Sequence, residues 1–259
     1  MQERIIGIMG AMPEEIHEVV ELLSGKETFT IGKRNYYVGS LHAVKTVAVF
    51  SRWGKVAAAT TVTTLIQEFH ITELIFTGVA GAIHPDLAIG DIVIAKRLVQ
   101  HDMDARPLMK EFEIPLLGLT FIECHPQQVD VATKAVSHLL ENKHLHAVIP
   151  TEQLQQFGIH HPKLHTGDIA SGDKFFAGSE DKTRLATKLP SVLCVEMEGA
   201  AVAQVCIEYE IPFTILRTIS DVADEQSPID FPSFLTEIAG KYSAEIIKNI
   251  FKHLSNESS

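Results

Sequence analysis

Residues 192–210 read VLCVEMEGAAVAQVCIEYE and predict the unit from which the fold is built. The first part is a short apolar run rich in valine, which favours a buried strand, and the second part has the helical spacing of about 3.6 residues. Comparable apolar runs occur at residues 5–9, 45–50, 73–79, 91–99 and 213–219. Helical patterns stand between them, at residues 13–23, 56–69, 127–142 and 231–254. This alternation predicts an α/β protein, a three-layer sandwich whose mixed, mostly parallel central sheet is covered by helices on both faces.

The length and composition fit one domain. The chain has 259 residues, of which 46% are hydrophobic, and this is enough to bury one large core. We expect the domain to span residues 1–254 and the terminal sequence SNESS, residues 255–259, to be disordered. Residues 101–125 and 143–165 lack a periodic pattern and are predicted to be loops or insertions on the surface.

The charge and the cysteines restrict the classes of partner and the compartment. A formal net charge of -11 would repel a phosphate backbone, so nucleic acid and anionic membrane surfaces are poor partners. The cysteines are odd in number and far apart, which favours free thiols in a reducing compartment over a disulfide framework. The chain starts directly with a strand-like run and has no apolar stretch of membrane-spanning length. These features predict a cytoplasmic protein.

Two carboxylates, Glu196 and Glu198, lie in the otherwise apolar or small-residue stretch 193–206. Charged side chains are rarely buried without a partner, and alternation along a strand would place both on one side. One arginine, Arg217, lies within a neighbouring apolar run and is the first candidate to pair with one of them. The residues alone leave open which carboxylate serves the fold and which a ligand.

Other strand ends also carry groups that could bind a ligand. Glu15 follows the first strand, the small-residue turn GVAGA (78–82) follows ELIFT (73–77), and Asp221 follows the run 213–219. Each has an alternative structural role: Glu15 could complement a helix dipole, GVAGA could form a tight turn, and Asp221 could be a helix N-cap. Thirteen histidines occur, including the pairs His144/His146 and His160/His161. Because no cysteine or carboxylate stands near these pairs at ligand spacing, we expect solvated loop histidines and no metal site.

Five segments resemble, in order, the 5'-methylthioadenosine/S-adenosylhomocysteine nucleosidases of the nucleoside phosphorylase superfamily. They are GIMGAMPEEI (7–16), TGVAGA (77–82), SGDKFF (171–176), VEMEGAAVAQVC (195–206) and RTISDVAD (217–224). The resemblance implies a homodimer with the nucleoside phosphorylase fold. It also implies hydrolysis of the N-glycosidic bond of 5'-substituted adenosines, with release of adenine and without a metal or organic cofactor.

The resemblance further implies roles for individual residues. Asp221 would donate a proton to adenine N7 and Ser220 would orient it, since adenine is a poor leaving group as an anion. Glu198, with the backbone of Met197, would bind the ribose hydroxyls and stabilise the positive charge that develops on the sugar. Glu15 would activate the attacking water.

The remaining residues that the resemblance places in the pocket bind the base or shape the cavity. Phe175 would stack on the base, and the backbone at Phe176 would form a hydrogen-bonding edge. Gly81 would line the pocket, while Phe231 and the loops 101–125 and 143–165 could shape the region of the 5' substituent. Trp53 stands where many family members have a smaller apolar residue, so it could act there too.

Under this assignment Glu198 serves the ligand and Glu196 pairs with a buried cation. Arg217 is the expected partner of Glu196, although it could instead touch the ribose.

Two rival functions remain. A nucleoside phosphorylase would need cationic groups for phosphate, and Arg52 is the residue that keeps this alternative open. A binding or storage protein would have the fold without turnover, although Glu15, Glu198 and Asp221 are all present. The irregular, partly apolar segment 106–119, RPLMKEFEIPLLGL, suggests a surface that a second copy covers, in a homodimer whose pocket the partner completes.

Overall fold

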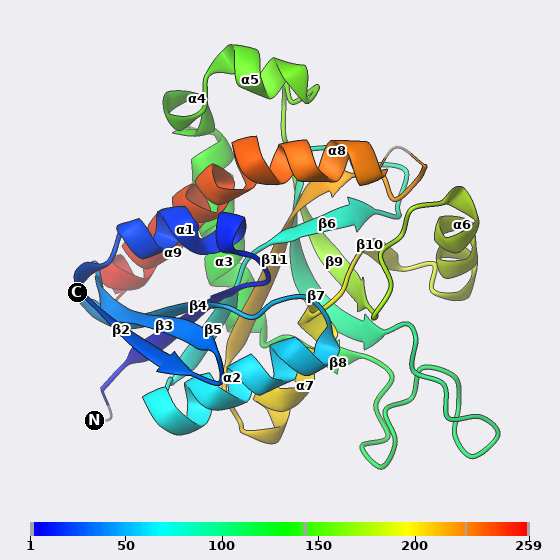
Figure 1. The fold of residues 1–259 in the computed structure, drawn as a ribbon. Helices are drawn as coiled ribbons and strands as arrows, with labels where there is room; N and C mark the ends of the chain where they lie inside the picture. The colour runs from blue at the N-terminus through cyan, green and yellow to red at the C-terminus, as the bar shows by residue number, and fades with distance from the viewer. Residues whose placement is uncertain (1–2, 142–143, 226, 258–259) are drawn as a thin grey trace.

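The computed structural model describes residues 3–141, 144–225 and 227–257. Within these residues eleven strands form a sheet in the order β2-β3-β4-β1-β5-β11-β6-β10-β9-β7-β8 (Figure 1). Their bounds are β1 (Ile5–Gly10), β2 (Ser24–Ile31), β3 (Arg34–Leu41), β4 (Val44–Phe50), β5 (Glu73–Phe76), β6 (Val79–Ala82), β7 (Ile92–Gln100), β8 (Ile122–Glu123), β9 (Leu164–Ser171), β10 (Val192–Glu196) and β11 (Phe213–Asp221).

The sheet is mixed, with a parallel centre as predicted. β1 runs parallel to β4 and β5, β11 runs parallel to β5 and β6, and β9 runs parallel to β7 and β10. Antiparallel pairs join β2 to β3, β3 to β4, β6 to β10, β7 to β11 and β7 to β8. β11 is buried along its whole length and pairs with β5 near its start and with β6 near its end. It therefore connects the two halves of the sheet.

Helices cover both faces of the sheet. Their bounds are α1 (Pro13–Glu21), α2 (Lys55–Phe69), α3 (Pro126–Glu141), α4 (His144–Val148), α5 (Thr151–Gln156), α6 (Ser179–Lys188), α7 (Gly199–Glu208), α8 (Ser227–Phe234), the π-helix η1 (Leu235–Ala239) and α9 (Gly240–Glu257). On one face α2 packs against α7, and on the other α9 packs against α1 and α3 (Figure 1).

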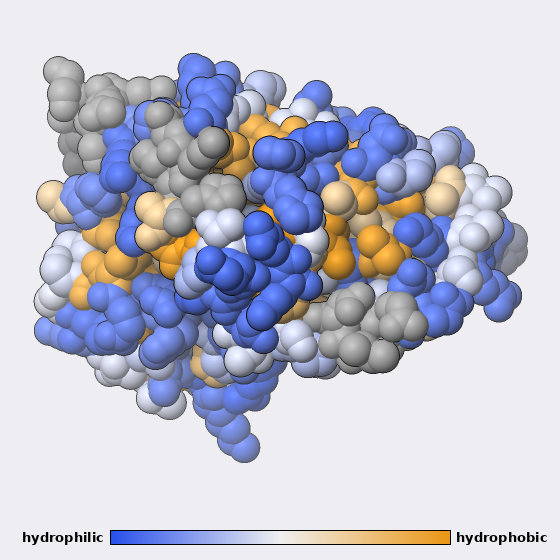
Figure 2. Space-filling model, turned by 90° about the horizontal axis from the view of Figure 1, so that it is seen from above, coloured by the Kyte–Doolittle hydropathy of each residue, from blue (hydrophilic) through white to orange (hydrophobic). Residues whose placement is uncertain are grey.

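A hydrophobic core lies on each side of the sheet, as the alternation of side chains along β1 illustrates. Ile6 and Ile8 join the core beneath α1, α3 and α9, whereas Ile5 and Met9 join the core beneath α2 and α7. The outer surface seen from above shows hydrophobic side chains in separate groups between polar ones (Figure 2). None of the helices in the described residues combines the length and apolarity that crossing a bilayer requires.

Several sequence-based boundaries need correction. Residues 143–165 were expected to be irregular, but α4, α5 and the start of β9 occupy most of this range. The helix predicted over 231–254 is interrupted by η1. The expected single strand 73–79 is divided into β5 and β6. α9 continues to Glu257, three residues into the tail expected to be disordered, and residues 258–259 lie outside the described part.

Candidate active site

Carboxylates from strand ends far apart in the sequence meet around one cavity of about 60 Å³. β1, β5, β11 and β6 run parallel to one another, whereas β10 runs antiparallel to β6 and its last residues lie beside β6. Residues at or after the ends of β1, β10 and β11, together with residues of β6, line the cavity. Of the residues predicted for the site, those that line this cavity are Glu15, Gly81, Phe175, Met197, Glu198, Ser220, Asp221 and Phe231. Ala11, Met12, Trp53, Val79, Ala80, Val195 and Glu196 complete the lining.

Glu15 is held rigidly in the first turn of α1. Its carboxylate accepts backbone N–H bonds from Ala11 at 2.6 Å, Met12 at 3.0 Å and Val79 at 3.1 Å. A Cβ atom at Gly78 would lie only 2.9 Å from Glu15 Oε1, so the glycine makes room for this arrangement. Burial raises the pKa of Glu15, although the charge of Arg217 and the three N–H bonds oppose the increase. A carboxylate with a raised pKa is suited to accept a proton.

Glu196 is held by an ion pair and by hydrogen bonds from within the protein. It forms an ion pair with Arg217 at 2.7 Å, and it accepts N–H bonds from Glu198 and Gly199 at the start of α7. The hydroxyl of Ser171 also donates to it. Glu196 therefore joins β9, β10, β11 and α7 at their junction, and its charge is compensated there.

Arg217 does not line the cavity. Its guanidinium donates to Glu196 and to the carbonyl oxygens of Phe76 and Leu216, and the side chain is almost completely buried. The described geometry corresponds to the ion-pair alternative, and the assignment of Arg217 as a substrate-binding residue does not agree with it.

Glu198 differs from Glu196 in position and in partners. β10 ends at Glu196, so Glu198 is the N-cap residue of α7 and not a strand residue, as alternation had suggested. Its Oε1 atom accepts the N–H of Gly54 at 2.8 Å. Burial, followed by the charge of Glu196, raises the pKa of Glu198 to about 8. The carboxylate faces the cavity with one oxygen held by the protein.

Asp221 lies at the end of β11 with both oxygens occupied. Its Oδ2 atom accepts the hydroxyl of Ser220 at 2.8 Å, and its Oδ1 atom accepts the N–H of Ala223 at 2.9 Å. A Cβ atom at Gly81 would lie 2.9 Å from Asp221 Oδ1, so this glycine gives the carboxyl group its space. Ser220 and Gly81 therefore fix the orientation of Asp221 toward the cavity.

Aromatic side chains border the cavity. Phe231 packs edge-on against Phe175 at 5.4 Å and against Trp53 at 6.2 Å between ring centroids. Trp53 is 54% exposed, so this end of the cavity meets solvent. The side chain of Phe176 points elsewhere and packs against His101 in a separate cluster.

The sequence reasoning missed the contribution of the start of α2. Gly54 and Lys55 donate their N–H groups to Glu198 and Asp173, which lie 144 and 118 positions further along the chain. The signal in the sequence is weak: a glycine before a helical run, which is common at helix starts.

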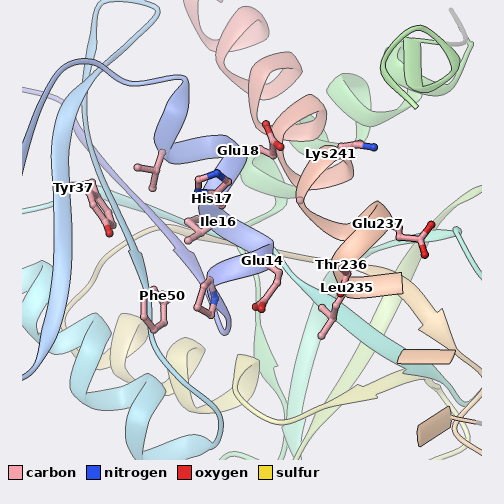
Figure 3. Close-up of a pocket in the computed structure, with 13 residues that line it drawn as sticks. Glu14, Ile16, His17, Glu18, Tyr37, Phe50, Leu235, Thr236, Glu237 and Lys241 are labelled. Atoms are coloured by element: carbon pink, nitrogen blue, oxygen red, sulfur yellow. The ribbon is translucent and has the colours of Figure 1, made fainter. Parts of the chain in front are cut away.

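A second cavity, of about 330 Å³, lies between α1 and the junction of η1 with α9 (Figure 3). Glu14, Glu18 and Glu237 line it, together with Tyr37, Phe50 and Leu235. Glu14 borders this larger cavity, whereas the adjacent Glu15 is buried beside the smaller one. The two neighbouring carboxylates of α1 are thus separated, and the larger cavity is not the one in which the predicted groups gather.

The described residues contain no group of three or more histidine, cysteine or acidic side chains arranged to hold a metal ion. Two members of the histidine pairs discussed above, His160 and His161, lie in the exposed segment before β9, and nothing is described for the side chains of His144 and His146.

The chain is similar to known proteins over almost its whole length. The sequence profile of the Phosphorylase superfamily matches residues 5–252. The 5'-methylthioadenosine/S-adenosylhomocysteine nucleosidase of Shewanella loihica is 33% identical over 251 residues, which are 96% of this chain and 99% of that protein. The aminodeoxyfutalosine nucleosidase of Helicobacter pylori is 36% identical over 250 residues, again 96% and 99% of the two chains.

A solved structure agrees with these sequence matches. The crystal structure of S-adenosylhomocysteine nucleosidase from Streptococcus pyogenes, in complex with 5-methylthiotubericidin, has a TM-score of 0.84 and 32% sequence identity, and the match covers 98% of each chain. By fold and by sequence, this chain belongs to the 5'-methylthioadenosine/S-adenosylhomocysteine nucleosidase family of the phosphorylase superfamily.

Proposed function

We propose that this protein hydrolyses the N-glycosidic bond of 5'-substituted adenosines and releases adenine. The observation that carries the proposal is the convergence of Glu15, Glu198 and Asp221 on one cavity beside a stacking aromatic ring, Phe175. Hydrolysis at this bond needs a water to be activated, a positive sugar to be stabilised and a base to be protonated. Separate carboxylates are available for each task.

The environments of the carboxylates support a division of these tasks. Glu15, with its raised pKa, would accept the proton of the attacking water. Glu198, whose second oxygen is not used by Gly54, would accept hydrogen bonds from the ribose hydroxyls. Asp221, fixed by Ser220, would deliver a proton to N7 of adenine. The backbones of Met197 and Phe176, the latter beside Phe175, would complete the contacts to ribose and base.

The cationic groups favour water over phosphate as the nucleophile. Arg52, the residue that kept a phosphorylase in consideration, donates to the carbonyl oxygen of Lys33 and is not part of the cavity lining. Arg217 is engaged by Glu196 beneath the cavity. The acidic lining would repel a phosphate ion, while it suits an activated water.

Release of adenine in phosphate-free buffer tests the proposal. The purified protein should release adenine and a free ribose derivative from methylthioadenosine, S-adenosylhomocysteine, 5'-deoxyadenosine or an aminofutalosine, and the relative rates identify the preferred 5' substituent. Added phosphate should leave the rate unchanged. Dependence on phosphate with formation of a sugar phosphate would establish a phosphorylase, and tight binding without release would establish a binding protein.

We further propose that the protein is a homodimer. Leu108 and Leu116 are 89% and 92% exposed, and they lie in the segment after β7 that projects from the body of the fold (Figure 1). Exposed leucines gathered in one segment are typical of a surface that another chain covers. Sedimentation of the wild type should give a dimer, and Leu116→Asp should weaken it, whereas Val148→Asp, on the exposed surface of α4, should not. A fully active monomer would refute this proposal.

We also propose that the protein is cytoplasmic. The support is that Cys124, Cys194 and Cys206 are free and buried, which agrees with a reducing compartment. Fractionation of cells that produce the tagged protein would test it.

A further inference from the structure

The start of α2 is capped by side chains from other parts of the fold. The N-cap residue, Gly54, has no side chain that could bind the free N–H groups of the first turn. Instead the N–H of Gly54 donates to Glu198 and the N–H of Lys55 donates to Asp173, both at 2.8 Å. Two carboxylates therefore lie at the positive end of the helix dipole, where negative charge is stabilised.

The side chain of Lys55 closes a ring of interactions at the same place. Its ammonium donates to Asp102 at 2.6 Å, and the other oxygen of Asp102 accepts the N–H of Asp173 at 2.9 Å. Asp173 in turn accepts the N–H of Lys55. Partial burial alone would raise the pKa of Asp102, but the hydrogen bonds from Lys55 and Asp173 hold it below its ordinary value. Lys55, Asp102 and Asp173 thus form a closed ring of hydrogen bonds, the α2 ring.

The α2 ring is connected to two parts of the candidate site, the segment that carries Phe175 and the carboxylate of Glu198. Asp173 lies two residues before Phe175, in the segment that carries the proposed base-stacking ring. Gly54 precedes Lys55, and its N–H is the one described protein hydrogen bond to the carboxylate of Glu198. Gly54 has a φ of 91°, and a Cβ atom there would lie 2.9 Å from Asp173 Oδ1, so a residue with a side chain would disturb both the backbone and Asp173 at this position.

We infer that Lys55 is a positioning residue, which acts through the α2 ring to hold Glu198 and the segment of Phe175 in the relative geometry that the substrate requires. The inference rests on the proposed function for the roles of these two groups. Lys55 itself is not among the residues that line the cavity. Small displacements of binding groups are costly in catalysis: a misplacement of about 1 Å can lower a rate by roughly 10²-fold.

The test compares Lys55→Met with the wild-type protein. The variant keeps most of the apolar stem but removes the ammonium, and we expect kcat/KM for a 5'-substituted adenosine to fall by roughly 10- to 100-fold, through both kcat and KM. Asp102→Asn, which keeps an acceptor for the N–H of Asp173 but loses the charge, should give a smaller loss. The double variant should lose less than the product of the two single losses, because both remove the same interaction.

The pH profile separates positioning from a general effect on folding. Burial and the nearby charges of Glu196 and Glu15 raise the pKa of Glu198. The N–H of Gly54 and the charge of Arg217 lower it. If Lys55→Met loosens Gly54, the acid limb of kcat/KM should move to higher pH. Lys26→Met is the matched control, because Lys26 forms an exposed ion pair with Glu21 at 2.7 Å and neither residue lines the cavity. Lys26→Met should change neither kcat/KM nor the acid limb of its pH profile.

Binding measurements keep the inference separate from the proposed function. Calorimetry with adenine, and with an adenosine analogue whose base is joined to the sugar by a carbon–carbon bond, needs no turnover. Lys55→Met should bind both more weakly than the wild type by at least fivefold. A wild type that binds but releases no adenine would refute the proposed function and leave this comparison valid.

The inference is overturned if folded Lys55→Met keeps wild-type kcat/KM, pH limb and affinities within twofold, whatever its thermal stability. If Lys55→Met does not fold, Asp102→Asn decides in the same way: an unchanged rate and pH limb would reject the α2 ring as a positioning device.

Discussion

The substitution Asp221→Asn tests the role of Asp221 as the general acid. The structure predicts that it changes the free energy of unfolding only slightly. The new amide oxygen can accept the N–H of Ala223, which now donates at 2.9 Å. The new amide nitrogen can donate to Ser220 Oγ, whose hydroxyl can turn toward the carbonyl oxygen of Ala80, at 3.4 Å. Because both contacts of the side chain are retained, we expect the free energy of unfolding to change by no more than about 1 kcal/mol.

The effect on catalysis should be much larger and should depend on the leaving group. An amide cannot supply a proton to adenine N7, so adenosine-type substrates should react roughly 10²- to 10⁴-fold more slowly, which corresponds to about 2.7–5.5 kcal/mol in the activation barrier. A riboside of nitrophenol leaves as a stable anion and needs no such proton. Its rate should fall far less, since Glu198 and Glu15 are untouched.

The assay is a pair of rate ratios, wild type over variant, measured for the two leaving groups on protein whose folding has been checked by thermal denaturation. A large ratio for adenosine substrates and a small one for the nitrophenyl riboside would support the role of Asp221. Equal losses with both substrates would mean that Asp221 only shapes the turn after β11, and the mechanism would need another acid.

Further predictions concern the other buried charges. Glu15→Gln should lower kcat by roughly 10²-fold or more with little change in the affinity for an adenosine analogue, whereas Glu14→Gln, at the next position, should leave both nearly unchanged; steady-state kinetics and calorimetry compare them. Arg217→Met should destabilise the fold by about 3–5 kcal/mol in urea denaturation, because Glu196 would keep a buried charge without its partner, and Arg217→Met with Glu196→Gln should be less damaging. The pKa of Glu198 is raised to about 8, so the folded protein holds a proton that the unfolded chain releases at lower pH. Its contribution to stability should be full below about pH 4.5 and be lost as the pH rises toward 8, and Glu198→Gln should flatten this part of a plot of melting temperature against pH.

The parts of the fold that the sequence predicted well are those with strong apolar signals. β1, β4, β7, β10 and β11 are rich in valine and isoleucine, and each was placed within two residues of its observed bounds. β2, β3 and β9 were missed because polar residues interrupt their pattern, and β2 is exposed along almost its whole length. The polar helix α6 was missed for the same reason. Burial on both faces leaves a clear sequence pattern, while an edge or a solvent-facing helix leaves little.

The site shows a similar limit. Glu15, Glu198 and Asp221 could be found because each stands at or after the end of an apolar strand, where ligands are expected to bind in an open α/β sheet. The partners that distinguish Glu196 from Glu198 could not be derived in full. Arg217 was a reasonable candidate, but the N–H of Gly54 depends on where α2 lies relative to α7, which no local pattern specifies.

The aromatic border of the cavity has a practical consequence. The cavity measures about 60 Å³, whereas ligand sites usually measure ~300–1,000 Å³, so we expect the entry of a nucleoside to move side chains at its border. Trp53 stands at the solvent end of the border and is the sole tryptophan of the chain. Its indole emission therefore comes from this one place in each protein molecule, without any label. Rapid mixing with a nucleoside would record the entry of the ligand as a change in that emission, and the delay before adenine appears would separate the opening of the site from cleavage of the bond.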